Sequence, residues 1–223
     1  MARAFDAVVF DLDGTLVDTA PDLHAHLNEM LAELGRPGLA LAEIRPMIGD
    51  GARALLQRGL EASGGPPASA DLDALFLAFL TRYTAQPVRF GRVYDGVVGV
   101  LEAFRAAGVR LGVCTNKAQA PSDRVLAELG LEGYFPVVIG GDSLAVRKPD
   151  PGHLRAVLER LGGAPGRAVM VGDSATDLAT ARAAGLPCVL VSFGYTPIAA
   201  AALGADRVID SMDELPNALA GLR

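Results

Sequence analysis

Close to its start the chain reads Val8-Val9-Phe10-Asp11-Leu12-Asp13-Gly14-Thr15, an apolar run that leads into a turn with two carboxylates. Continuous apolar runs of this kind are typical of strands buried on both faces of a parallel sheet. Similar runs occur at residues 109–114, 137–139, 168–171, 188–191 and 207–209. Helical patterns separate them and end at glycines, as at Gly108 and Gly185. The alternation predicts an α/β fold with a doubly wound, Rossmann-like parallel sheet.

The segment between the first two predicted strands does not follow this alternation of strands and helices. From residue 18 to about residue 90 the apolar residues follow helical spacing, and no strand pattern occurs. One helical stripe begins near Thr19, a second covers residues 52–62, and a third follows a Gly-Gly-Pro-Pro linker. A crossover between neighbouring parallel strands needs only one helix. We therefore expect a core of residues 1–17 and 91–223, with a small helical domain of residues 18–90 inserted into it.

Composition limits the classes of partner. The chain has 223 residues and a formal net charge of −6, and it contains no long basic run, so binding to nucleic acid or to an anionic membrane is not expected. Its two cysteines, Cys114 and Cys188, lie in apolar runs and are interpreted as buried thiols. The N-terminus has no long apolar stretch, and no run approaches the ~18 residues of a membrane span. We expect a cytoplasmic protein.

Four carboxylates follow two of the predicted strands. Asp11 and Asp13 come after the first strand, and Asp173 and Asp177 come after the run at 168–171. Ligands of open α/β sheets bind at the carboxyl ends of the strands. Two unit charges about 4 Å apart repel by about 4 kcal/mol at an effective dielectric near 20, so such a cluster implies a cation. Oxygen-only ligands favour Mg²⁺ over zinc. Taken alone, Asp177 is also compatible with an acid that stabilises a helix N-terminus.

Two further predicted strand ends carry groups that suit an anion. Thr115 and Asn116 follow the run at 109–114 and supply a hydroxyl and amides. Lys148 precedes a rigid Pro-x-Pro that starts a helix. Taken alone, Lys148 is better explained as a solvent-exposed lysine.

Together these residues resemble the haloacid dehalogenase superfamily of phosphohydrolases. Its four motifs appear in order, as Asp11-Leu-Asp-Gly-Thr15, Thr115, Lys148 and Gly172-Asp-Ser-x-x-Asp177. Within the superfamily the chain is most similar to phosphoglycolate phosphatases. That similarity rests on the segments Leu16–Asp22, Ile48–Gly51, Cys114–Lys117, Val137–Asp142, Lys148–Pro151 and Phe193–Tyr195. The helical insertion matches the small cap of this family.

The resemblance implies a mechanism for the carboxylates. Asp11 is the nucleophile that becomes an aspartyl phosphate, and Asp13 acts as general acid and then as general base. Mg²⁺ is held by the Asp11 carboxylate, the Asp13 backbone carbonyl and Asp173. Asp177 is not a direct metal ligand; it holds a metal-bound water or orients Lys148.

The resemblance also implies the binding groups. Thr115, the Asn116 amide and Lys148 hold the phosphate oxygens. In the cap, Gly49 and Gly51 precede a predicted helix whose N–H groups are available to a substrate carboxylate, although the same segment also fits a plain turn. The expected partner is a small phosphorylated metabolite, 2-phosphoglycolate, hydrolysed by a monomer or homodimer.

Several alternatives share parts of this pattern. A dehalogenase on this fold does not need the acid at Asp13. A phosphosugar mutase needs Asp13 and tends to place a histidine in the cap, where this chain has His24 one step away from the usual position. Phosphatases for sugar phosphates or pyrophosphate share the core motifs. A non-catalytic phospholigand-binding module is expected to lack a motif residue, and this chain lacks none.

Overall fold

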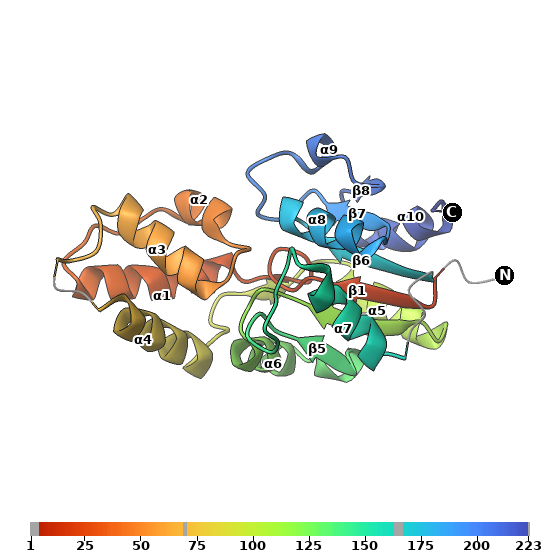
Figure 1. Ribbon diagram of the computed structural model, residues 1–223, viewed down its shortest axis with the longest axis horizontal. Helices are drawn as coiled ribbons and strands as arrows, with labels where there is room; N and C mark the ends of the chain where they lie inside the picture. The colour runs from red at the N-terminus through yellow and green to blue at the C-terminus, as the bar shows by residue number, and fades with distance from the viewer. Residues whose placement is uncertain (1–4, 69–70, 163–166, 223) are drawn as a thin grey trace.

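Six parallel strands form the core of the molecule (Figure 1). The computed structural model describes residues 5–68, 71–162 and 167–222. The strands lie in the order β5-β4-β1-β6-β7-β8. Their bounds are β1 Ala7–Phe10, β4 Arg110–Cys114, β5 Val137–Ile139, β6 Ala168–Gly172, β7 Cys188–Val191 and β8 Arg207–Ile209. Each neighbouring pair is parallel, which confirms the predicted sheet to within one residue at every strand end.

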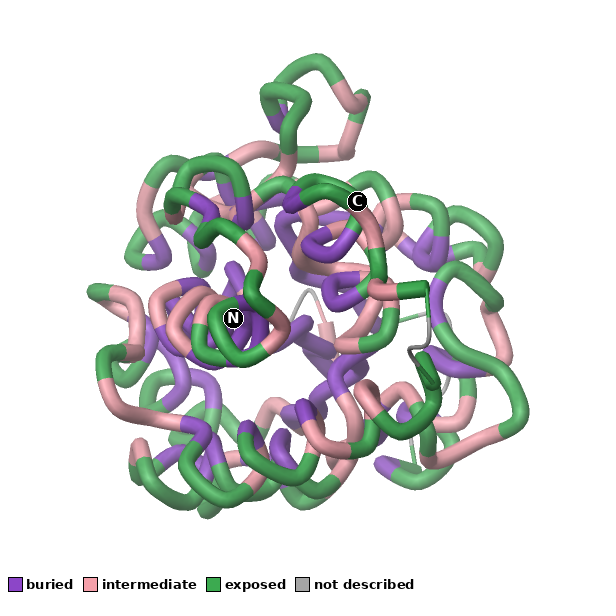
Figure 2. The backbone as a smooth tube through the Cα atoms, turned by 90° about the vertical axis from the view of Figure 1, so that its left-hand side faces the viewer, coloured by how far each residue is buried: buried purple, intermediate pink, exposed green. Residues whose placement is uncertain are grey.

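Both faces of the sheet are covered, as the continuous apolar runs predict. Alternate side chains of a strand point to opposite faces. Val8 and Phe10 of β1 pack in one hydrophobic cluster with α5, α6 and α10, and Ala7 and Val9 pack in another with α7, α8 and α9. The buried residues accordingly gather in the interior of the molecule (Figure 2). The helices are α5 Val97–Ala106, α6 Gln119–Glu128, α7 Pro151–Arg160, α8 Ala175–Ala184, α9 Ala200–Leu203 and α10 Leu215–Ala220, with short 3₁₀ turns η2 Glu132–Tyr134 and η4 Met212–Glu214.

A separate group of helices lies to one side of the sheet (Figure 1). It consists of α1 Ala20–Glu33, α2 Leu41–Ile44, the 3₁₀ turn η1 Arg45–Met47, α3 Ala52–Ala62 and α4 Leu72–Ala85. These helices enclose a hydrophobic cluster of their own, in which Leu27, Leu56 and Phe79 are buried. We call this group the cap. The helical stripes predict α1, α3 and α4, whereas α2 and η1 are too short to leave a periodic pattern.

The two connections between cap and core are joined to each other. β2 (Val17–Asp18) and β3 (Arg92–Val93) form an antiparallel pair, which the sequence pattern does not predict because two residues carry no periodicity. In α1 the buried Asp22 accepts hydrogen bonds from the backbone N–H groups of residues 89, 90 and 91 at 2.7–2.9 Å. These bonds fix the direction in which the cap leaves the core.

Two predictions from composition can be compared with the structure. Cys114 and Cys188 are free and buried, which confirms their interpretation as buried thiols. Over the described ranges, none of the helices combines the length and apolar character that crossing a membrane requires.

Candidate active site

Three carboxylates meet at the carboxyl ends of β1 and β6. Asp11 follows β1, Asp173 follows β6, and Asp177 lies in the first turn of α8; one oxygen of each lies within 4.8 Å of the others. β1 and β6 are neighbours, so their ends bring these residues together. Gly172 is required for this approach, because a Cβ there would collide with the Asp177 side chain. The sequence prediction that these carboxylates share one edge of the sheet agrees with this geometry.

Lys148 lies between two of these carboxylates. Its Nζ is 2.9 Å from Oδ1 of Asp11 and 2.7 Å from Oδ1 of Asp177, and the residue is only 3% exposed. Burial opposes the charged form of a lysine, but the two carboxylates outweigh that effect and raise the pKa of Lys148. The structure therefore excludes the alternative of a solvent-exposed lysine.

The carboxylates carry more negative charge than Lys148 can balance. Burial, opposed by Lys148 and reinforced by Asp177, raises the pKa of Asp11 to about 6. Burial and the charges of Asp177 and Asp11 also raise the pKa of Asp173 well above its usual range. A divalent cation at these oxygens would remove this penalty, and a donor set made only of oxygens fits a hard cation. The residues present thus fit a metal ion.

The hydrogen bonds distinguish Asp177 from the other two carboxylates. Its Oδ1 binds Lys148, and its Oδ2 accepts from the backbone N–H groups of Asp173 and Ser174, both at 3.1 Å, and from the Ser174 hydroxyl at 2.7 Å. In contrast, no hydrogen bond within the described ranges reaches Oδ2 of Asp11 or Oδ1 of Asp173. These two oxygens remain available to a ligand. The geometry favours Asp177 as a residue that orients Lys148 and the β6–α8 turn.

Asp13 faces a different set of groups. Its Oδ1 accepts from the Thr19 hydroxyl at 2.6 Å and lies 3.0 Å from Nζ of Lys117. Thr19 precedes α1, as its sequence position predicts, but its hydroxyl does not cap the helix and binds Asp13 instead. A hydroxyl has one proton to donate, and here that proton is directed to a carboxylate of the core.

Thr115 and Asn116 lie at the end of β4, next to β1. The side-chain amide of Asn116 donates to the carbonyls of Gly49 and Lys148, at 3.1 Å each, so it joins the cap loop to the Lys148 segment. Within the described ranges no hydrogen bond engages the backbone N–H of Asn116, which leaves that group for an anion. The hydroxyl of Thr115 accepts from the N–H of Lys117 at 3.2 Å and keeps its own proton to donate.

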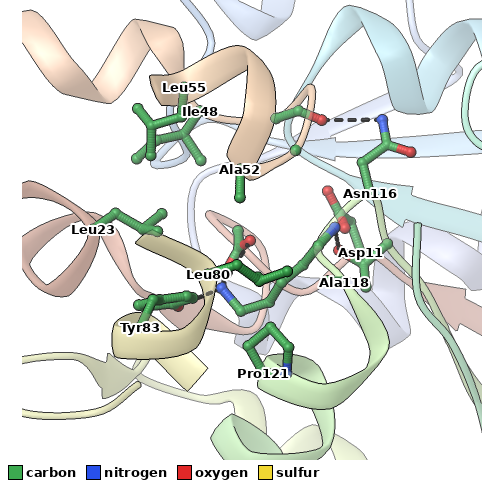
Figure 3. A pocket seen from close by; sticks show the side chains of 15 residues that line it. Asp11, Leu23, Ile48, Ala52, Leu55, Leu80, Tyr83, Asn116, Ala118 and Pro121 are labelled. Atoms are coloured by element: carbon green, nitrogen blue, oxygen red, sulfur yellow. Dashed lines mark hydrogen bonds and ion pairs between the residues drawn. The ribbon is translucent and has the colours of Figure 1, made fainter. Parts of the chain in front are cut away.

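A cavity lies between the cap and these residues (Figure 3). Its floor includes Asp11, Asp13 and Thr115, and its cap side is mostly apolar, with Leu23, Ile48, Leu55 and Leu80. Gly51 lines the cavity with φ +87, a conformation that favours glycine, and a Cβ there would lie 3.0 Å from the Asn116 carbonyl oxygen. Gly49 turns its carbonyl, rather than an N–H, toward the core at Asn116. Helix α3 starts directly after Gly51 without a side-chain cap.

Two polar residues of the cavity are absent from the predicted site. Lys117 forms an ion pair with Asp13 and a hydrogen bond with the hydroxyl of Tyr83, which α4 contributes. Lys117 directly follows Thr115 and Asn116, and this position is a signal for its place in the site. Tyr83 belongs to the apolar stripe of α4, where it is indistinguishable from a core residue.

His24, the residue that bears on the mutase alternative, lies inside the cap. Its Nε2 is 3.0 Å from the carbonyl oxygen of Leu39 and 3.0 Å from the side-chain nitrogen of Asn28. It is not among the described residues that line the cavity. This position gives His24 no contact with a substrate above Asp11.

The chain belongs to the haloacid dehalogenase-like hydrolase family, whose model matches residues 5–185. It is 46% identical over 211 residues to the phosphoglycolate phosphatase of Caulobacter vibrioides, across 95% of this chain and 89% of the relative. The phosphoglycolate phosphatase of Rhodospirillum rubrum is also 46% identical, over 213 residues, 94% of this chain and 88% of the relative. The protein is a phosphatase of this family.

Solved structures agree in fold. A protein described as a predicted phosphoglycolate phosphatase from Haemophilus somnus superimposes with a TM-score of 0.92 at 29% identity, over 97% of this chain and 99% of that chain. CbbY from Rhodobacter sphaeroides, solved in complex with phosphate, gives a TM-score of 0.81 at 30% identity, over 95% of this chain and 96% of that chain. A mutant of the same CbbY has been solved in complex with xylulose-(1,5)bisphosphate.

Proposed function

We propose that this phosphatase hydrolyses 2-phosphoglycolate to glycolate and phosphate, with Asp11 as nucleophile and Mg²⁺ as cofactor. The observation that carries the proposal is the buried carboxylate cluster paired with Lys148, of which Asp11 lines a mostly apolar cavity beneath the cap. The relatives named as phosphoglycolate phosphatases support the choice of substrate. Two free cysteines support a reducing compartment, the cytoplasm.

Asp11 is held in position for attack on phosphorus. Its Oδ1 accepts the N–H of Leu12 at 2.7 Å and binds Lys148, which leaves Oδ2 free to form the aspartyl phosphate. Asp11 and Asp173 would hold Mg²⁺, together with the Asp13 backbone carbonyl. When bound, the cation offsets the repulsion between the Asp11 carboxylate and the incoming phosphate.

Asp13 protonates the leaving alkoxide and then takes a proton from the water that hydrolyses the aspartyl phosphate. Thr19 and Lys117 fix the orientation of its carboxylate beside Asp11. One carboxyl group suffices for both steps, because the first step leaves it ionised and the second returns its proton.

Three groups surround the phosphoryl oxygens. Lys148 contributes a buried positive charge, Thr115 a hydroxyl proton, and Asn116 a backbone N–H. Negative charge spreads over these oxygens in the transition state, and donors already in place stabilise it without reorganisation.

The substrate is tested with a panel of phosphate monoesters assayed with Mg²⁺. We expect the highest kcat/KM for 2-phosphoglycolate, because a short ester fits beneath the apolar cap residues. Xylulose 1,5-bisphosphate belongs in the panel, since a related fold binds it. A preference for a sugar bisphosphate or pyrophosphate would reject the proposed substrate and leave the phosphatase assignment intact.

Asp173→Asn is expected to raise the Mg²⁺ concentration for half-maximal rate by at least about 10-fold, because it removes a charged metal ligand. Asp13→Asn is expected to lower kcat with little change in that concentration, since Asp13 contributes only its backbone carbonyl to the metal. Mg²⁺ titrations of the hydrolysis rate measure both quantities. Equal shifts in Mg²⁺ dependence for the two variants would contradict the assignment of the ligands.

A further inference from the structure

The cavity above Asp11 is lined by a cationic side chain other than that of Lys148. Of the described residues that line this cavity, Lys117 is the one with a cationic side chain. Lys117 lies in the loop after β4, and only 4% of its side chain is exposed. Burial of a lysine costs free energy unless a charged partner lies beside it. Asp13, whose Oδ1 is 3.0 Å from Nζ of Lys117, is this partner. The side chain is held at the boundary between the catalytic floor and the apolar cap.

Lys117 supplies a positive charge to the cavity, and Tyr83 beside it keeps a proton that it can donate. Among the described residues, the Lys117 ammonium contacts both carboxylate oxygens of Asp13, at 3.0 and 3.3 Å, and the Tyr83 hydroxyl. An ammonium cannot accept a hydrogen bond, so Tyr83 accepts from Lys117 and its own phenolic proton remains available. Burial raises the pKa of Tyr83 to about 12, which keeps that proton in place at neutral pH. The cationic Lys117 and the Tyr83 hydroxyl donor therefore adjoin, and both residues line the cavity.

These donors lie close to the position of the leaving group. Asp13 is the acid that contacts the ester oxygen of the substrate, and Lys117 contacts Asp13 directly. An anionic group one carbon away from the ester oxygen would lie within reach of Lys117. The distal phosphate of a sugar bisphosphate is several carbons further away and would not.

We infer that Lys117 and Tyr83 form the subsite for a second anionic group of the substrate, a carboxylate attached one carbon from the phosphate ester. This inference rests on the proposed function and names the residues that select its substrate. The carboxylate accepts a hydrogen bond from the Tyr83 hydroxyl and pairs with the positive charge of Lys117, and Leu23, Leu55 and Leu80 exclude water around it. The cap contributes Tyr83 and the core contributes Lys117, so the subsite is complete only when the cap lies over the core.

Three arginines of the cap pair with carboxylates outside the cavity. Arg45 pairs with Asp18 at 3.2 Å, Arg53 pairs with Asp73 at 2.6 Å, and Arg58 pairs with Asp50. None of these arginines is among the described residues that line the cavity. The subsite is therefore assigned to Lys117 rather than to a cap arginine.

The test compares two phosphonates that differ only in the carboxylate. In 3-phosphonopropionate a methylene replaces the ester oxygen of 2-phosphoglycolate, and n-propylphosphonate has a methyl group in place of the carboxylate. We expect the wild type to bind the first at least about 30-fold more tightly, measured as competitive inhibition constants, because a charged hydrogen-bonded pair is lost with the second. Lys117→Met is expected to reduce that ratio to below about 5-fold.

A second subsite variant keeps the test valid if Lys117→Met folds poorly, and a surface variant serves as its control. Tyr83→Phe removes only the hydroxyl and is expected to reduce the ratio about 5-fold. Arg124→Met removes an exposed charge of α6 that pairs with Glu128, and is expected to leave the ratio unchanged. Thermal unfolding of each variant checks that it is folded.

The outcomes separate this inference from the proposed function. If the wild type prefers 2-phosphoglycolate and Lys117→Met retains the binding ratio, the subsite is wrong and the proposed substrate stands. If the wild type hydrolyses other esters in preference but the ratio still falls in Lys117→Met, the subsite holds for a different acidic phosphate ester. A wild-type ratio near 1 overturns the subsite.

Discussion

Replacement of Asp11 by Asn is expected to lower kcat by about 10⁴-fold or more. The amide has nearly the shape of the carboxylate, but it neither attacks phosphorus nor carries the charge that a metal ion needs. Steady-state assays with 2-phosphoglycolate and with an aryl phosphate should show the same loss, since both substrates present a phosphoryl group to Asp11.

The matched control is Asp123→Asn, which makes the same chemical change on the exposed face of α6. We expect its kcat to remain within about 2-fold of the wild type, since surface substitutions away from special features have small effects. An Asp11→Asn enzyme with more than a tenth of the wild-type rate would show that the nucleophile lies elsewhere.

Replacement of Lys148 by Met is expected to abolish detectable turnover and to lower the free energy of unfolding by about 3–5 kcal/mol. The stability loss follows because Asp177 has no exposed surface and loses its only cationic partner within the described ranges. Turnover is lost because the charge beside Asp11 disappears. Urea unfolding in excess EDTA measures the stability term without metal binding.

The double variant Lys148→Met with Asp177→Asn separates the two effects. Removing both charges of the buried pair should recover at least about 2 kcal/mol of the lost unfolding free energy, since contacting residues are coupled. It should not restore turnover, because the positive charge at the phosphate is still absent. Recovery of activity in the double variant would show that Lys148 serves only to balance Asp177.

Most of the core could be predicted because its strands carry continuous apolar runs. The first run ends at Phe10 and the observed strand ends there too. The antiparallel pair of β2 and β3 could not be predicted, since four residues in total hold no period. For the same reason the short helix α2 is absent from the prediction, whereas α3 follows its stripe over residues 52–62.

Some residues of the site could likewise be predicted from the sequence, and others could not. Asp11 and Asp173 could be predicted because each follows a strand, and strands of a parallel sheet end at one edge. The place of Tyr83 in the site could not be predicted. A buried aromatic residue of a helix has the same sequence pattern whether it packs in the core or lies in a ligand site. The contact between Tyr83 and Lys117 depends on the placement of the cap over the core, which no local pattern encodes.

Trapping of the phosphorylated enzyme shows whether the phosphoryl group passes through Asp11. An aryl phosphate has a good leaving group, so formation of the intermediate should outrun its hydrolysis. The wild type is mixed with this substrate and Mg²⁺, quenched in acid within milliseconds, reduced with borohydride and mapped by peptide mass spectrometry. We expect homoserine at position 11 in a substantial fraction of the chains and none in the Asp11→Asn variant. Active enzyme that carries the modification at another residue, or at none, would contradict it.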